Sequence, residues 1–275
     1  MVEDKRVNQS LQKNTLSSLP KVKGVWYATN PLEDQFEVTY YNLRDREGRI
    51  YDDKDCANLP AVEMGHRHHK EWSIRQFSAD ILIDNIKRNG KNESILDIGC
   101  GNGWLSSYLQ NQVNCQVVGL DRNVVELEQA ARVFIQENLC FVYGDVFHMP
   151  FSKECFDVIV LAASCQYFAN FSRLIRTLIP YLSLTGSIYI VDTPFYSSVS
   201  EAQEAKERSH FYYKSNDAEV LLDHYHHHLW SQLDEFNSEV IYNPHSLFNR
   251  LKRKFIPHLS PFPLIKIKSR SELND

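Results

Sequence analysis

The sequence lacks the features of a membrane-spanning or secreted protein. No segment of its 275 residues approaches the roughly 18 apolar residues of a membrane span. The first residues, MVEDKRVNQSLQKN, contain no apolar signal-peptide core. The six cysteines form no C-x-x-C pair. We therefore expect free thiols in a reduced, cytoplasmic protein that has no membrane partner.

An excess of positive charge is also missing. The chain has 30 Lys and Arg against 35 Asp and Glu, and the formal net charge of −5 argues against a nucleic-acid partner. Its hydrophobic and charged fractions, 43% and 24%, are ordinary for a globular protein. A chain of this length forms one large domain or one domain with appendages.

One stretch, from Ser94 to Leu109, has the order of a ligand site. It begins with an apolar, β-prone run, places glycines at Gly99, Gly101 and Gly103, and continues in a helical pattern. Glycine permits positive φ and lets a ligand approach the backbone closely. The helix that follows points its free N–H groups and positive dipole end at the turn. This order predicts a cradle for a cofactor.

The spacing of these glycines separates two kinds of cofactor. A dinucleotide fingerprint is G-x-G-x-x-G, whereas this turn is G-x-G-x-G. Trp104 stands at the position of the last fingerprint glycine, where an indole would obstruct close packing of helix on strand. Asp97 ends the strand before the first glycine. A carboxylate there suits a cationic cofactor better than a pyrophosphate.

Buried strands alternate with helical patterns over the middle of the chain. The expected strands are 94–98, 115–121, 139–145, 156–164 and 187–195, and the expected helices include 65–90, 123–134 and a long one over 166–182. This alternation predicts a parallel sheet covered on both faces. Right-handed crossovers bring the carboxyl ends of the strands to one edge, where ligands bind.

Acidic residues end the first three of these strands, at Asp97, Asp121 and Asp145. A single acid at such a point is usually a turn residue. Three in register behind the glycine turn indicate a shared site. An acid that ends the second strand can accept hydrogen bonds from both hydroxyls of a ribose. Asp121 alone does not distinguish between cofactors that contain an adenosine.

The pattern D-x-G-x-G-x-G resembles motif I of the class I S-adenosylmethionine (SAM) dependent methyltransferases. The resemblance covers Ser94 to Phe195, and the NGWLS continuation and the preceding EW-x-x-R-x-x-S pattern resemble bacterial members. It implies a Rossmann-like, doubly wound α/β fold with a mostly parallel sheet of seven strands. The segments 237–244 and 262–269 would supply the sixth strand and an antiparallel seventh.

The resemblance also implies which residues hold SAM. In the order of the cofactor parts that they would contact, these residues are Asp97, Gly99, Gly101, Asn102 and Gly103 for the amino-acid and ribose parts, Asp121 for the ribose, Asp145 and Val146 for the adenine, and Leu161 and Ala162 for the sulfonium and methyl.

The remaining segments surround this expected domain. We expect a loose N-terminus over 1–20, an aromatic-rich N-terminal cap over 21–64, and a SAM-binding domain over 65–275 that carries a lid insert at 196–236. A short basic helix, SLFNRLKRKFI, separates the last two strands. We interpret it as a solvated face; an acidic substrate or RNA would be the functional alternative.

Histidines raise the question of a general base and of a metal. His66, at the start of the helix over 65–90, and His210, in the lid, are candidates for a base that would help a hydroxyl or amine acceptor. The segment HYHHHLW places His224 and His228 at i and i+4, but no third ligand accompanies them. We therefore predict no metal.

The sequence thus predicts a SAM-dependent methyltransferase with a small-molecule acceptor. The Asn/Asp-Pro-Pro-Tyr/Phe motif of amino-directed nucleic-acid methyltransferases is missing, and LAASCQYF stands in its place. Two alternatives stay open at this point. One is an NAD-dependent oxidoreductase, and the other is a catalytically silent methyltransferase-like binding protein. The acceptor and the oligomeric state are not predicted.

Overall fold

The computed structural model describes residues 16–31, 35–90, 94–256 and 258–269. Most of the N-terminal segment expected to be loose, residues 1–15, lies outside the described residues. Leu16 is buried in the hydrophobic core. The end of that segment therefore packs on the domain.

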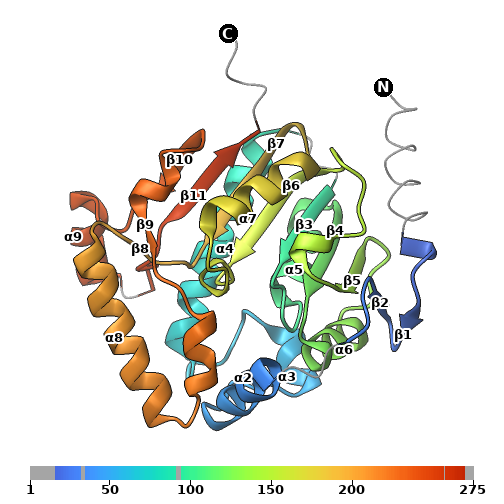
Figure 1. Ribbon diagram of the computed structural model, residues 1–275, viewed down its shortest axis with the longest axis horizontal. Coiled ribbons are helices and arrows are strands. Elements are labelled where there is room, and N and C mark those ends of the chain that lie inside the picture. Colours follow the sequence, from blue (N-terminus) through green and yellow to red (C-terminus); the bar gives the residue numbers. More distant parts are fainter. Residues whose placement is uncertain (1–15, 32–34, 91–93, 257, 270–275) are drawn as a thin grey trace.

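A nine-stranded sheet runs through the centre of the molecule (Figure 1). In spatial order its strands are β1 (Lys21–Val22), β2 (Val25–Tyr27), β5 (Leu139–Tyr143), β4 (Gln116–Asp121), β3 (Ser94–Ile98), β6 (Phe156–Ala162), β7 (Leu182–Val191), β11 (Leu264–Lys268) and β10 (Ser238–Tyr242). Neighbours from β2 to β7 are parallel, and β11 is antiparallel to β7 and to β10. The seven expected strands and the antiparallel last strand are confirmed.

Two further strands come from the segment assigned to the N-terminal cap. β2 pairs parallel to β5, with Val25 opposite Phe141, and β1 pairs antiparallel to β2. Val25 is completely buried. These strands are too short to show the period-two alternation that identifies a strand in a sequence. They cover an edge of the sheet that would otherwise expose unpaired N–H and C=O groups.

Helices cover both faces of the sheet, as a doubly wound fold requires. One core cluster joins the sheet to α4 (His69–Arg88), α5 (Trp104–Val113) and α6 (Val124–Val133), and the other joins it to α7 (Phe171–Leu178). Alternate side chains of β3 divide between the clusters, with Ile95 in one and Leu96 in the other. This alternation follows from the period-two direction of side chains along a strand.

The prediction of one long helix over 166–182 is wrong. α7 begins after Asn170, whose side-chain oxygen accepts a hydrogen bond from the N–H of Arg173. A separate 3₁₀ turn occupies Cys165–Tyr167, and strand β7 already begins at Leu182. The apolar pattern alone predicts one continuous helix, but Asn170 caps α7 and so separates it from the preceding turn.

A layer that we call the roof lies over the carboxyl end of the sheet. It consists of α2 (Gln35–Arg46), α8 (Val199–Ser215) and the 3₁₀ helix η4 (Glu219–His224), and its own apolar cluster contains Leu43, Tyr213, Ala218 and Leu221. Figure 1 shows the blue α2 beside the end of the orange segment that contains α8. The remaining α-helices and strands are α3 (Asp53–Asn58), the strand pair β8 (Phe195–Tyr196) and β9 (His228–Leu229), and α9 (Leu247–Phe255). Short 3₁₀ helices occupy Val146–His148, Ile179–Tyr181 and Trp230–Leu233.

Candidate functional site

The glycine turn follows β3 at the carboxyl edge of the sheet. Gly99, Gly101 and Gly103 have φ of +73°, +51° and +77°. A Cβ atom on Gly99 would lie only 2.5 Å from the Cβ of Ser164, in the loop after β6. The turn therefore needs glycine both for its backbone conformation and for its close contact with the neighbouring loop.

Asp121, at the end of β4, braces this turn. Its carboxylate accepts hydrogen bonds from the backbone N–H of Gly101 at 2.8 Å, Arg122 at 2.6 Å and Asn123 at 2.8 Å. Burial raises the pKa of Asp121, and these three N–H groups oppose that rise. A carboxylate offers about four acceptor positions, so capacity for a ligand hydroxyl is left.

Asp97 lies buried beneath the turn. Its Oδ2 accepts a hydrogen bond from the hydroxyl of Ser106 at 2.6 Å, while Oδ1 has no hydrogen-bond partner among the described residues. Burial raises the pKa of this carboxyl to about 7, which Ser106 opposes. Asp97 is thus a buried acid with one oxygen that no described protein group satisfies.

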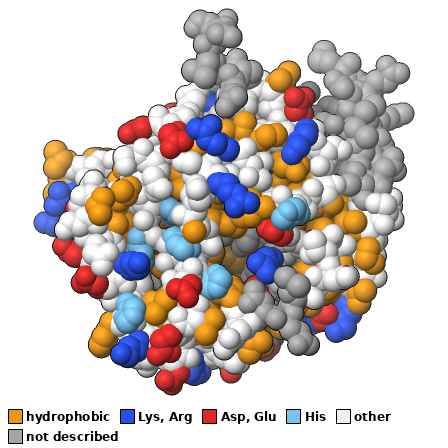
Figure 2. Space-filling view, viewed as in Figure 1, with side chains coloured by type: hydrophobic (Ala, Val, Ile, Leu, Met, Phe, Trp, Pro, Cys, Tyr) orange, Lys and Arg blue, Asp and Glu red, His pale blue; other side chains and the backbone are white. Residues whose placement is uncertain are grey.

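A cavity of about 1190 Å³ opens above the turn, between the sheet edge and the roof. Figure 2 shows the hollow near the centre of this face, with histidine side chains close to it. Single small-molecule pockets usually measure about 300–1,000 Å³. The cavity is therefore large enough for a cofactor and a second molecule together.

Most residues that the sequence assigned to the cofactor lie in the wall of this cavity. They are Gly99, Gly101, Asn102, Asp121, Asp145, Val146 and Ala162. Asp97, Gly103 and Leu161 are not among the lining residues. Leu161 is fully buried in the core, because its side chain points to the opposite face of the strand from that of its neighbour Ala162.

Two strained residues stand at the ends of β6 and β7. Ala163 and Asp192 both have φ of +51° and both line the cavity. Such backbone conformations are unfavourable for residues other than glycine and concentrate at functional sites. Asp192 accepts a hydrogen bond from the hydroxyl of Ser78 at 2.6 Å. The positive φ of these two residues could not be predicted from the sequence, because neither alanine nor aspartate by itself indicates such a backbone conformation.

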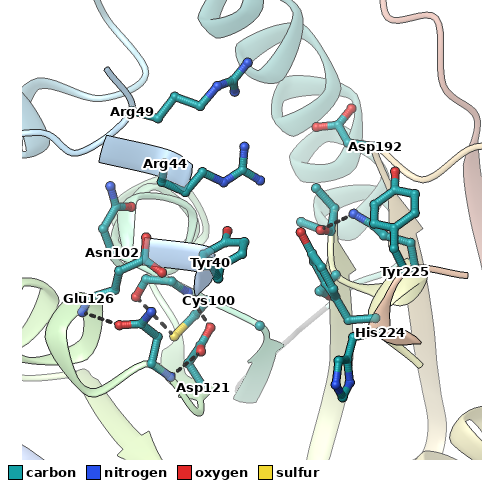
Figure 3. Close-up of a pocket in the computed structure, with 18 of the residues that line it drawn as sticks. Tyr40, Arg44, Arg49, Cys100, Asn102, Asp121, Glu126, Asp192, His224 and Tyr225 are labelled. Atoms are coloured by element: carbon teal, nitrogen blue, oxygen red, sulfur yellow. Dashed lines mark hydrogen bonds between the residues drawn. The ribbon is translucent and has the colours of Figure 1, made fainter. Parts of the chain in front are cut away.

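Aromatic rings also line the cavity, with Tyr40 from the roof helix α2, Tyr167 from the 3₁₀ turn after β6 and Tyr225 directly after η4. Tyr167 packs edge-to-face on Tyr40 and on Tyr225, with centroid distances of 6.0 and 5.9 Å. The guanidinium of Arg44 lies 4.9 Å from the centroid of the Tyr40 ring. Figure 3 shows Tyr40 and Arg44 on one side of the cavity and Tyr225 on the other. We call this aromatic-lined part of the cavity, which the glycine turn also lines, the aromatic chamber.

Ion pairs connect the roof to α4. Arg49 donates to Glu71 at 2.5 Å, and Arg75 donates to the same carboxylate at 3.2 Å. Burial opposes ionisation of Glu71, but the two guanidinium groups outweigh it and lower its pKa. Glu47, which follows α2, pairs with Arg44 at 3.0 Å and accepts a hydrogen bond from Tyr212 of α8. Charged contacts thus tie the two halves of the roof together.

Neither histidine proposed as a base lines the cavity. His66 stacks on Tyr51 at a centroid distance of 5.9 Å, and His210 is exposed on α8. His210 points away from the cavity that Ser209 and Tyr212 line, since α-helical side chains turn by about 100° per residue. The lining histidines are His68, His224 and His227.

The histidine-rich segment is not a helix over its whole length. His224 ends a 3₁₀ helix, whereas His228 lies in β9 and its Nε2 is 3.1 Å from the carbonyl oxygen of Cys165. The i and i+4 geometry considered for a metal pair therefore does not form. Among the described residues, no three His, Cys, Asp or Glu side chains are grouped as a metal site.

Residues 89–239 match a family model described as "Methyltransferase domain". This match covers more than half of the chain. The chain belongs to this methyltransferase family. The resemblance seen in the glycine turn is thereby confirmed at the level of the family.

Individual methyltransferases are similar over different lengths. Tocopherol O-methyltransferase of Arabidopsis thaliana is 21% identical over 209 residues, which cover 74% of this chain and 58% of that protein. Sterol 24-C-methyltransferase of Debaryomyces hansenii is 36% identical over 99 residues, which cover 34% of this chain and 26% of that protein. The match thus spans well under two thirds of the length of either relative.

Two solved structures share the fold. The plantazolicin methyltransferase BpumL, in complex with SAH, superposes with a TM-score of 0.53 at 20% identity, covering 85% of this chain and 100% of that one. The YcgJ protein of Bacillus subtilis gives a TM-score of 0.54 at 16% identity, covering 71% and 99%. The Rossmann-like fold of this methyltransferase-family chain is therefore confirmed.

None of the helices in the described part of the chain has the length and apolar content that crossing a bilayer requires. All six cysteines are free, and five of them are buried.

Trp104 packs edge-to-face on Trp72 of α4 at a centroid distance of 5.3 Å. The indole thus fills the junction of α4 and α5, where a dinucleotide fingerprint would have glycine.

Proposed function

We propose that the protein transfers a methyl group from SAM to a small-molecule acceptor. The observation that carries the proposal is the glycine turn braced by Asp121 in the floor of the cavity. The three positive-φ glycines allow a nucleoside to approach the backbone closely, and Asp121 at the end of β4 can accept hydrogen bonds from its ribose hydroxyls. Membership of the methyltransferase family supports the same assignment.

The chain would hold the cofactor with residues from four strand ends. Asp121 would accept hydrogen bonds from the ribose, and Asp145 and Val146 would flank the adenine. Ala162, at the end of β6, would lie near the reacting group, with the aromatic chamber opposite it. When bound, SAM supplies a methyl group already activated by a positively charged sulfur.

The protein's main task is then alignment. The acceptor's nucleophilic atom must stand about 3–3.5 Å from the methyl group and in line with the departing sulfur. The roof would hold the acceptor in this geometry and keep water out. The lone pair of the acceptor forms the new bond to carbon, and the electrons of the broken carbon–sulfur bond return to sulfur. A hydroxyl or amine acceptor also loses a proton.

His227 is our candidate to receive that proton. Burial, followed by the charge of His228 and His226, lowers the pKa of His227, so its neutral form is favoured. Its Nε2 lies 3.1 Å from the hydroxyl of Ser209 on α8. His227→Gln should slow turnover of a hydroxyl acceptor and leave cofactor affinity unchanged. Equal turnover by the variant would exclude this role.

The names of the relatives favour acceptors of low molecular mass. They include tocopherol, sterol and plantazolicin methyltransferases. The aromatic walls of the chamber suit an apolar or planar acceptor. We place the reaction in the cytoplasm, which the six free thiols support, and we propose no nucleic-acid partner.

Ligand binding measured by calorimetry tests the proposal. S-adenosylhomocysteine should bind the wild-type protein, and Asp121→Ala should weaken that binding at least about tenfold, because the ribose loses its acceptor and the turn loses its brace. Asp84→Ala, on an exposed position of α4, is the matched control and should bind normally.

The same titrations separate the alternatives. Binding of NAD but not of S-adenosylhomocysteine would indicate the oxidoreductase. Tight binding of S-adenosylhomocysteine without methyl transfer across a broad panel of acceptors would favour the silent binding protein. Unchanged affinity in Asp121→Ala would refute the assigned site.

A further inference from the structure

Helix α9, between β10 and β11, presents apolar side chains to solvent. Leu247, Phe248, Leu251 and Phe255 are 79%, 65%, 58% and 83% exposed. No residue of this helix is buried. Scattered single apolar residues on a surface are normal, but four on one short helix form a patch that marks an interaction site.

The four apolar residues share one face of the helix. At about 100° per residue, they fall within a sector of roughly 100°. Lys252 and Lys254 fall just outside the two borders of that sector. The helix is therefore amphipathic, with its apolar face turned away from the protein rather than onto it.

The charged residues of α9 are all basic. Arg250, Lys252, Arg253 and Lys254 lie within the helix, and the sequence LFNRLKRKF contains no Asp or Glu. Figure 2 shows blue basic and orange hydrophobic side chains next to one another at the left edge, where α9 lies in Figure 1. This local charge opposes the net −5 of the whole chain.

Little of the domain supports this helix. Ser246 caps it, and the side-chain amide of Asn249 donates to the carbonyl oxygen of Asn243 at 2.8 Å. An isolated helix of nine residues is marginal in water, and most helices gain their stability by burying an apolar face. A partner that covers the exposed face would supply that stability.

The topology places α9 at the same edge of the sheet as the cavity. β10 is antiparallel to β11, which is antiparallel to β7, so β10 runs parallel to β7. The carboxyl end of β10, where α9 follows, therefore lies at the carboxyl edge of the parallel strands. Phe262, between α9 and β11, lines the cavity.

We propose that α9 docks into the headgroup layer of a membrane rich in anionic phospholipids. Leucine and phenylalanine would enter the boundary of the acyl chains, and Lys252 and Lys254, which border the apolar face, would meet the phosphate groups. RNA would satisfy the charges but leave the apolar face in water. A second copy of α9 would cover the apolar face but bring like charges together.

This proposal replaces our sequence-based expectation of no membrane partner. That expectation rested on the lack of a spanning segment, and a helix that lies in the interface needs none. The sequence showed the basic residues but not that the apolar ones face outward. Docking does not depend on the methyltransferase assignment, but it would hold the edge of the cavity close to a lipid acceptor.

Vesicle co-sedimentation of the full chain tests the proposal. The protein should bind vesicles of phosphatidylcholine mixed with phosphatidylglycerol at least about tenfold more tightly than vesicles of phosphatidylcholine alone, and high salt should weaken this binding. Phe248→Ser with Phe255→Ser should reduce binding at least about tenfold. Lys252→Gln with Lys254→Gln should remove the preference for the anionic lipid.

Val199→Ser, at a 72% exposed position of α8, is the matched apolar control and should bind like the wild type. Equal melting temperatures and equal affinity for S-adenosylhomocysteine would show that the α9 variants are folded. Absence of vesicle binding by the wild type, or equal binding by all variants, would overturn the proposal. So would an α9-dependent dimer or α9-dependent RNA binding in place of vesicle binding.

Discussion

At the scale of single residues, the buried carboxyl of Asp97 makes the stability of the folded protein depend on pH. Burial keeps this carboxyl protonated in the folded protein up to about pH 7, whereas its ordinary pKa is 3.8. Between these values the folded state holds a proton that the unfolded state has lost, so stability falls as pH rises through that window. The difference corresponds to up to about 4 kcal/mol at full burial.

We therefore expect Asp97→Asn to flatten the decline in stability between about pH 4 and pH 7. Thermal or urea unfolding of both proteins across that range measures it. Glu126, whose pKa burial raises to about 8, contributes a decline of the same sign to both proteins. A variant whose stability falls with pH as steeply as that of the wild type would show that Asp97 is ionised throughout.

The sequence predicted where the acidic residues of the site lie along the chain, but not which way their side chains point. Asp97 is the last residue but one of β3, Asp121 ends β4 and Asp145 follows β5, and these positions agree with the pattern of apolar runs. The pattern does not say that Asp97 turns inward to Ser106 while Asp121 faces the cavity. His66 and His210 failed as lining residues because helix phase and loop geometry decide which ring reaches the cavity.

At the scale of elements, the junction of the turn with α5 permits no added atom. A Cβ on Gly103 would lie 2.7 Å from the ring of Phe141 and 2.7 Å from the Cβ of Ala130. We expect Gly103→Ala to lower the free energy of unfolding by about 2–4 kcal/mol, from overpacking and from left-handed strain together. Chemical denaturation measures this change.

Gly90→Ala is the matched control. Gly90 also has a left-handed φ, of +103°, but a Cβ there would meet nothing within 4 Å. Its replacement should cost only the strain, about 1 kcal/mol. Equal costs for the two variants would mean that Phe141 and Ala130 yield to the added methyl group.

Element type was predictable where a periodic pattern was long enough. α4 and α6 lie within their expected ranges, and Asn123 caps α6 as proposed, accepting from the N–H of Glu126. β1 and β2 could not be found in this way. A strand of two or three residues has no measurable period and exists because β5 offers it an edge.

At the scale of the whole molecule, the roof depends on contacts between distant parts of the chain. Leu221 of η4 is 2% exposed in the cluster that also contains Leu43 of α2. Leu221→Ala should create a cavity there and loosen the roof by about 2–4 kcal/mol. We expect hydrogen exchange of α2 and α8 to accelerate more than about tenfold while β3 and β6 stay protected.

Val125→Ala, at a 56% exposed position of α6, serves as the comparison and should leave exchange unchanged. If Leu221→Ala instead accelerated exchange evenly through the sheet, the roof would not be a separate unit of stability. The sequence anticipated a cap and a lid but not their contact. The side chains of α2 and η4, which are far apart in the sequence, come into contact only in the folded protein.

The roof also sets the order in which a newly made chain becomes competent. Its first half leaves the ribosome before any central strand, and its second half leaves after all five parallel central strands. Until residues 219–224 emerge, the growing polypeptide has a complete glycine turn but an incomplete roof, because Leu221 of η4 belongs to the apolar cluster that joins α2 to α8. Closure of the roof thus follows synthesis of the glycine turn and of the central strands, and a translation product interrupted before η4 would have an incompletely covered reaction chamber.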